Sequence, residues 1–120
     1  MEAQEKSLKK PWPEFYADLK ANQKPDDVRW KIIFHYSVEE RTRQFYLDRE
    51  LVVVTGNYRI TRCILMRPVT HFQVTEAVCS DADNFCRRVG RGISFRRLIS
   101  STPFEHHLKI KNALPNGCRL

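Results

Sequence analysis

Five arginine residues stand close together near the C-terminal end of the chain, between positions 87 and 97. The arginine guanidinium is a planar fork of hydrogen-bond donors that matches the oxygens of a phosphate group, and it also stacks on nucleobases. Positive charge with an aromatic residue among it is typical of proteins that hold RNA or single-stranded DNA. A purely solvated helix face is the alternative. We predict a nucleic-acid contact surface that includes Arg87, Arg88, Arg91, Phe95 and Arg97.

A second basic set lies on the first predicted strand, VRWKIIFHYS at residues 28–37. Its large apolar residues alternate with the others, which indicates a sheet strand with one buried face. Arg29, Lys31 and His35 fall on the opposite face, which we expect to be wet and positively charged. Arg29 and Lys31 therefore join the predicted nucleic-acid surface.

The whole chain is basic, with 21 Lys and Arg against 14 Asp and Glu and a formal net charge of +7. Such a charge favours an anionic partner, although it also serves solubility alone in some proteins. We expect the partner to be nucleic acid, either RNA or DNA, or an acidic protein surface. We expect no membrane association.

Catalytic and cofactor patterns are scarce. The chain has no phosphate-binding loop, no dinucleotide-binding glycine motif, and no metalloprotease or nucleophile-elbow motif. His35 and His71 with Glu76 could form an acid–base or metal site if their strands pair, but we favour solvent-facing histidines. A thiol with a lowered pKa at Cys79 is an alternative to a small buried residue. We expect a protein that is not an enzyme and has no cofactor and no metal.

The four cysteines include no C-x-x-C pair, which disfavours a zinc knuckle or ribbon. The charged start of the chain lacks a signal-peptide core, and no apolar run reaches the roughly 18 residues of a transmembrane helix. We therefore expect a cytoplasmic protein with reduced thiols.

The elements that must position these residues fit a single α+β domain. Residues 1–10 are polar and are expected to form a flexible N-terminal arm, and residues 102–120 a C-terminal tail. Between them, in residues 11–101, a short helix begins near Pro13 and ends before Pro25. An antiparallel sheet of three to four strands follows, and then a C-terminal helix that packs on the sheet.

The connections in the middle of the sheet have alternative predictions. Residues 37–50 match either a helix, because Ser37 and Glu40 resemble a capping box, or a hairpin with its turn at residues 38–41, which we prefer. Residues 51–55 read as a strand, Gly56-Asn57 as a turn, and residues 58–66 as the next strand. An uncovered strand edge in such a sheet would permit a homodimer.

The C-terminal helix is predicted from Ser80, a good N-cap, with an apolar stripe that packs on the sheet. Gly90 and Gly92 are each unfavourable in a helix by roughly 1 kcal/mol. They indicate close packing of helix on sheet, which we favour, or the approach of a ligand, and we expect the helix to kink or end there. The predicted stripe consists of Ala82, Phe85, Cys86, Val89 and Ile93.

This segment resembles a motif of small uncharacterised proteins from bacteriophages and their bacterial hosts, in which strands precede a helix of this type. The resemblance covers residues 79–97 only, and those proteins usually carry alanine and glycine where this chain has Phe95 and Arg96. It implies an architecture and a phage origin, and no chemistry. The matching residues are Cys79, Ser80, Asp83, Phe85, Arg87, Gly90, Arg91, Ile93 and Arg97.

Two hypotheses follow. The first is a small, basic, non-catalytic protein that binds nucleic acid, and it rests on the charge and on the arginine helix. The second is a phage or mobile-element accessory protein that binds and modulates a host protein, and it rests on the motif and the small size.

Overall fold

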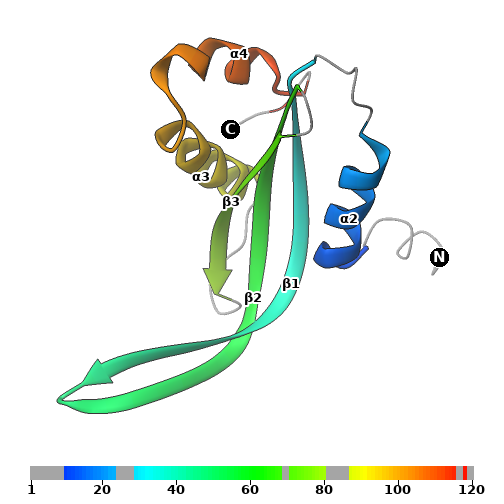
Figure 1. The fold of residues 1–120 in the computed structure, drawn as a ribbon. Coiled ribbons are helices and arrows are strands. Elements are labelled where there is room, and N and C mark those ends of the chain that lie inside the picture. Colours follow the sequence, from blue (N-terminus) through cyan, green and yellow to red (C-terminus); the bar gives the residue numbers. More distant parts are fainter. Residues whose placement is uncertain (1–9, 24–28, 69–70, 81–86, 116–117, 119–120) are drawn as a thin grey trace.

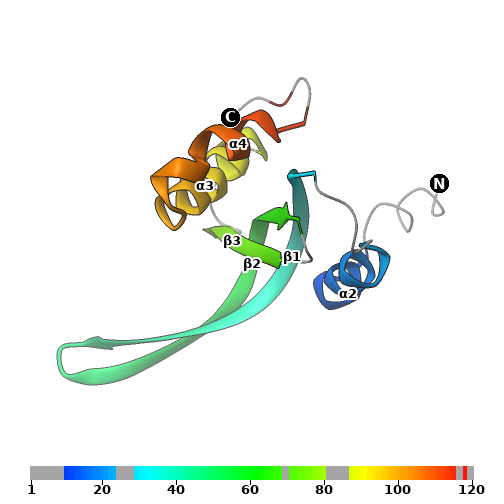
Figure 2. The same cartoon turned by 45° about the horizontal axis from the view of Figure 1, so that its top comes forward.

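The computed structural model describes residues 10–23, 29–68, 71–80, 87–115 and 118. They form the expected α+β fold, in which a three-stranded antiparallel sheet of order β1-β2-β3 lies between helices (Figure 1). Helix α2 covers one face, and α3 and α4 cover the other (Figure 2). The elements are α2 (Trp12–Asn22), β1 (Lys31–Leu47), β2 (Glu50–Arg67), β3 (His71–Ser80), α3 (Arg87–Ser100), the 3₁₀ helix η1 (Phe104–His106) and α4 (His107–Asn112).

Strands β1 and β2 form one long hairpin of 17 and 18 residues. Its turn is Asp48-Arg49, where both residues have positive φ angles of 51° and 70°, as in the two-residue turns that match the twist of paired strands. The predicted turn at residues 38–41 is therefore wrong, because those residues belong to β1. The predicted Gly56-Asn57 turn is also wrong, since Gly56 pairs with Arg41 inside the hairpin.

Strand β3 pairs only with residues Tyr58 to Arg67 of β2. Residues 40–47 and 50–57 therefore continue beyond the three-stranded sheet as a two-stranded ribbon, which we call the hairpin arm (Figure 1). A two-stranded hairpin alone is marginally stable in water. The arm nevertheless carries several large apolar side chains that remain exposed.

The main core lies between the sheet and the C-terminal helices. It includes Ile110 of α4, so part of the segment after residue 101 packs with the domain. The buried face of α3 differs from the predicted stripe: Val89 is 57% exposed, and Ala82, Phe85 and Cys86 lie outside the described residues. The buried cluster comprises Ile32, Cys63, Leu65, Phe95, Leu98 and Ile110.

Gly90 allows α3 to lie close against the sheet. A methyl group at this position would come within 3.1 Å of the Thr61 Cβ and closer still to its hydroxyl. The helix runs without a break through Gly90 and Gly92, and both residues are buried. The favoured interpretation of close packing is confirmed at Gly90, and the expected end of the helix at these residues is wrong.

Helix α2 covers the sheet face that we expected to be wet. The His35 ring is only 6% exposed and lies 4.6 Å from the Phe15 ring and 5.3 Å from the Trp12 ring, measured between centroids. Its Nε2 is 3.0 Å from the Lys10 carbonyl oxygen. The prediction that His35 faces solvent is wrong, because the aromatic side chains of α2 pack against the same face of the sheet.

Candidate nucleic-acid interface

The first turns of α3 carry three of the predicted arginines. Arg87 and Arg88 are exposed, and the Arg87 guanidinium lies 4.4 Å from the centre of the Tyr36 ring on β1. Arg91 is partly buried and donates from Nη1 to the Tyr36 hydroxyl at 3.0 Å, which raises the pKa of its guanidinium. Tyr36 therefore holds two of these arginines against the sheet.

The last turns of α3 carry the other two arginines, Arg96 and Arg97, and both are exposed. Arg97 donates from Nη1 to the backbone carbonyl of Glu76 at 2.6 Å. Because the helix is continuous, the arginines at its two ends belong to one rigid rod. At 1.5 Å per residue, Arg87 and Arg97 are about 15 Å apart along its axis.

Phe95 is not part of this surface. It is 6% exposed and packs in the core beside Leu98. The predicted role of Phe95 in stacking on bases is therefore withdrawn. The predicted apolar stripe placed Val89 against the sheet, whereas the contact of Gly90 with Thr61 turns the Phe95 side of the helix inward.

Arg29 and Lys31 do not join the arginines of α3. They line a cavity of about 280 Å³ together with Leu19, Gln23 and Met66, on the face that α2 covers. Side chains of a strand alternate between faces, so Lys31 and Tyr36 lie on opposite sides of the sheet. The predicted surface is thus two separate basic regions, and we retain only the region on α3.

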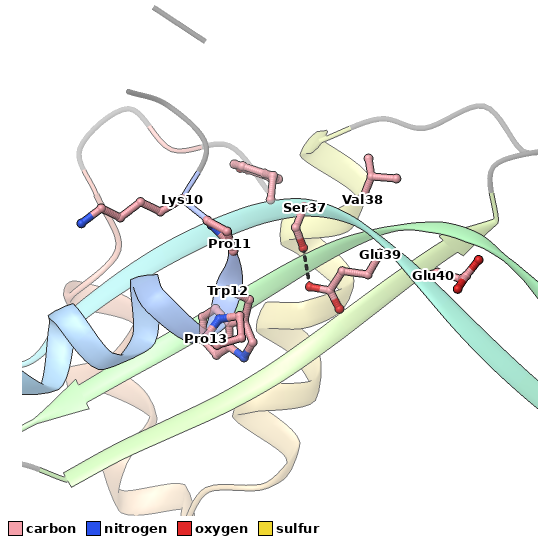
Figure 3. A pocket seen from close by; sticks show the side chains of 9 residues that line it. Lys10, Pro11, Trp12, Pro13, Ser37, Val38, Glu39 and Glu40 are labelled. Carbon is pink, nitrogen blue, oxygen red and sulfur yellow. Dashed lines mark hydrogen bonds between the residues drawn. The ribbon is translucent and has the colours of Figure 1, made fainter. Parts of the chain in front are cut away.

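A larger cavity of about 710 Å³ has Tyr36 in its lining. It lies where β1 passes the beginning of α2, and Figure 3 shows the side chains around it. Glu39 accepts a hydrogen bond from Ser37 within it (2.7 Å). The cavity is lined by Lys10, Pro11, Trp12, Pro13, Tyr36, Ser37, Val38, Glu39 and Glu40.

A buried arginine lies beneath this cavity. The Arg62 side chain is 4% exposed and binds Glu39 through two hydrogen bonds of 2.6 and 2.9 Å. Its Nε donates to Glu76 on β3 at 2.9 Å, and its guanidinium lies 4.5 Å from the Trp12 ring centre. Arg41 donates twice to the same Glu76, at 3.1 Å each. These four charged residues, which we call the Arg62 network, join all three strands.

The Arg62 network was not predicted, although the sequence carries a signal for it. Arg62 interrupts an apolar alternation formed by Ile60, Ile64 and Met66, and Glu76 occupies the matching position on β3. One positive and one negative residue, each among apolar residues on neighbouring strands, are typical of an ion pair that is shielded from water.

The pKa of Glu39 is lowered to about 2, primarily by its hydrogen bonds to Arg62. A carboxyl group whose pKa is lower in the folded than in the unfolded state stabilises the protein at pH values above its unfolded pKa, which is near 4.5. This contribution to stability is lost as the pH falls towards 2. We expect Glu39→Gln to remove up to about 3 kcal/mol of this acid-sensitive stability. Urea unfolding at pH 7 and pH 3 measures it.

The exposed neighbour Glu40 supplies the matched control. Glu40→Gln should keep the difference in stability that the wild type shows between the two pH values. An unchanged difference in Glu39→Gln would contradict the assignment of acid sensitivity to Glu39.

The proposed histidine pair is not formed by the strand register. His35 pairs with Arg62 on β2, whereas His71 pairs with Arg67, five positions along the strand. That separation is about 17 Å. The buried Cys63 thiol has its pKa raised to about 12 by desolvation. Among the described residues, no three His, Cys, Asp or Glu side chains gather where they can hold a metal ion.

The chain matches no protein-family model, no curated protein and no solved structure. Within the part of the chain that the structure describes, no helix is both long and apolar enough to cross a membrane.

Proposed function

We propose that this protein binds nucleic acid without catalysing a reaction, and that the exposed arginines of α3 contact the phosphate backbone. The observation that carries the proposal is the composition and exposure of one helix. Helix α3 has five arginines and no acidic residue, and four of the five are exposed. Arginine is suited to this role because its planar fork matches phosphate oxygens.

The dimensions support a contact with several phosphates. Arg87 and Arg97 are about 15 Å apart along the helix axis. One strand of a duplex presents a phosphate about every 3.4 Å along its axis, so this length matches about four phosphates. Contacts of this type hold nucleic acid in place without reading its sequence.

The pairing of charges in the Arg62 network and the state of the Cys63 thiol support a non-catalytic role. Arg41 and Arg62 bind the carboxylates of Glu39 and Glu76, and both carboxyl pKa values are lowered. A carboxylate held in this way is a weak proton acceptor near neutral pH. The high pKa of Cys63 likewise makes its thiol a poor nucleophile.

Changing Arg87, Arg88 and Arg96 together to alanine should weaken nucleic-acid binding at least about tenfold while the fold remains. Arg91 is left in place because its bond to Tyr36 anchors the helix. Fluorescence anisotropy at low salt, with labelled single-stranded and double-stranded RNA and DNA, measures the affinity.

A control variant removes the same charge elsewhere, with the exposed Lys20, Lys109 and Lys111 changed to alanine. It should bind within about threefold of the wild type, since these lysines lie on α2 and α4 and the proposed contact is made by α3. No binding of any of the four nucleic acids by the wild type would end the proposal, and a pull-down would then test an acidic protein surface as the partner.

A further inference from the structure

The hairpin arm exposes apolar side chains on both of its faces. On one face Phe45 is 41% exposed, Leu47 59% and Val54 43%, and no other described element covers them. On the other face Tyr46 is 74% exposed. Together the apolar side chains of the arm expose on the order of a few hundred Å², about the size of the largest patch on a typical monomer. A ribbon of two strands with this surface is expected to be covered by a partner.

We propose that a second copy of this chain covers the arm, and that the two arms pack face to face in opposite directions. The face in question is the one continuous with Arg62 and Glu39, because residues two apart on a strand share a face. On the arm it presents the apolar residues Phe45, Leu47, Val52 and Val54.

The charges at the borders of this face are self-complementary. Phe45 pairs with Val52 at its centre; Arg43 lies one row towards the body, and Glu50 one row towards the tip. A twofold axis over the central row exchanges these rows between copies. Arg43 of each copy then lies beside the partner's Glu50, as an isologous interface requires.

The distribution of charge also favours a second copy at the arm. Together with its turn, the arm contains three basic residues, Arg41, Arg43 and Arg49, and three acidic residues, Glu40, Asp48 and Glu50. Its net charge is therefore zero, and the rest of the chain carries the whole excess of +7. Pairing through the arms joins two neutral regions and keeps the two basic bodies apart, which reduces repulsion.

The area favours a dimer of moderate affinity. A typical stable interface buries about 800 Å² on each partner, and one face of the arm offers less. We therefore expect a dimer that dissociates in the micromolar range. This inference does not depend on nucleic-acid binding, and it is tested on nuclease-treated protein.

Sedimentation velocity of the full chain, from about 1 to about 200 µM, should show a monomer that converts to a dimer. Phe45→Glu should abolish the dimer over this range. Tyr46→Glu is the matched control, because this neighbour lies on the opposite face of the arm, and it should dimerise like the wild type. Circular dichroism checks that both variants remain folded.

Charge exchange tests the direction of pairing without altering the apolar face. Arg43→Glu and Glu50→Arg should each weaken the dimer about tenfold, and the double variant should recover most of the wild-type affinity. A wild type that stays monomeric to 200 µM would overturn the proposal. So would a dimer that Tyr46→Glu dissociates and Phe45→Glu does not, or a double variant no better than the single ones.

Discussion

Arg62→Met is expected to lower the free energy of unfolding by about 3–5 kcal/mol, because it leaves two carboxylates on a covered sheet face without their shared cation. Glu39 loses both of its hydrogen bonds from Arg62, while Glu76 keeps Arg41. Trp12 also loses the guanidinium beneath its ring. The shift in the urea midpoint, with the slope of the transition unchanged, measures the effect.

Two further variants separate charge from packing. Adding Glu39→Gln to Arg62→Met removes the uncompensated charge, because Arg41 still balances Glu76, and should restore about half of the lost stability or more. The exposed Arg96 is the control, and Arg96→Met should change stability by no more than about 0.5 kcal/mol. If Arg62→Met were as mild as Arg96→Met, the Arg62 network would not stabilise the sheet.

Gly90→Ala should also destabilise the protein, although alanine favours a helix by about 1 kcal/mol. The added methyl would overlap the Thr61 side chain on β2, so α3 must move away from the sheet. Overpacking of this kind costs about 1–3 kcal/mol. Thermal or urea unfolding shows whether the steric cost exceeds the gain in helix propensity.

Gly56 provides the matched glycine control, since a methyl there would approach no atom closer than 3.9 Å. Gly56→Ala should be neutral or slightly stabilising. Thr61→Ala, combined with Gly90→Ala, should recover part of the loss, because the two side chains meet directly. Additive effects of the two changes would contradict the close contact of α3 with β2.

The general architecture could be predicted because it follows from local patterns. The prolines around α2 mark the start and end of that helix, and the alternation from Val28 to Tyr36 identifies the first strand. The glycines of α3 indicated close packing on the sheet, which the contact at Gly90 confirms. The predicted α+β fold of helix, antiparallel sheet and helix is confirmed.

The length of the hairpin could not be predicted from local signals. Gly56-Asn57 has the composition of a turn, yet in the structure it lies within β2. The true turn at Asp48-Arg49 is the position that pairs two long β-rich runs along their full length. That choice depends on register between distant residues, which no single stretch encodes.

The candidate site could be predicted only in part, because contacts between distant residues also decide which side chains are exposed. The arginines of α3 lie within eleven residues, so their presence on one helix could be predicted. Arg87 and Arg96 are nevertheless about two and a half turns apart and therefore project to opposite sides of it. Phe95 was misplaced because the buried face of α3 is set by its contact with Thr61, not by the helix alone. Arg29 and Lys31 were misplaced because the alternation of β1 predicts a solvent-exposed face there, whereas α2 covers that face of the sheet.

The most direct test of the account is the salt dependence of nucleic-acid binding for the wild type and for the variant with Arg87, Arg88 and Arg96 changed to alanine. Each phosphate contact adds about 0.7–0.9 to the slope of log affinity against log salt. If these arginines contact phosphates, the slope of the variant should be shallower by about 2–3. Equal slopes for the two proteins would show that nucleic acid binds elsewhere, and would contradict the assignment to α3.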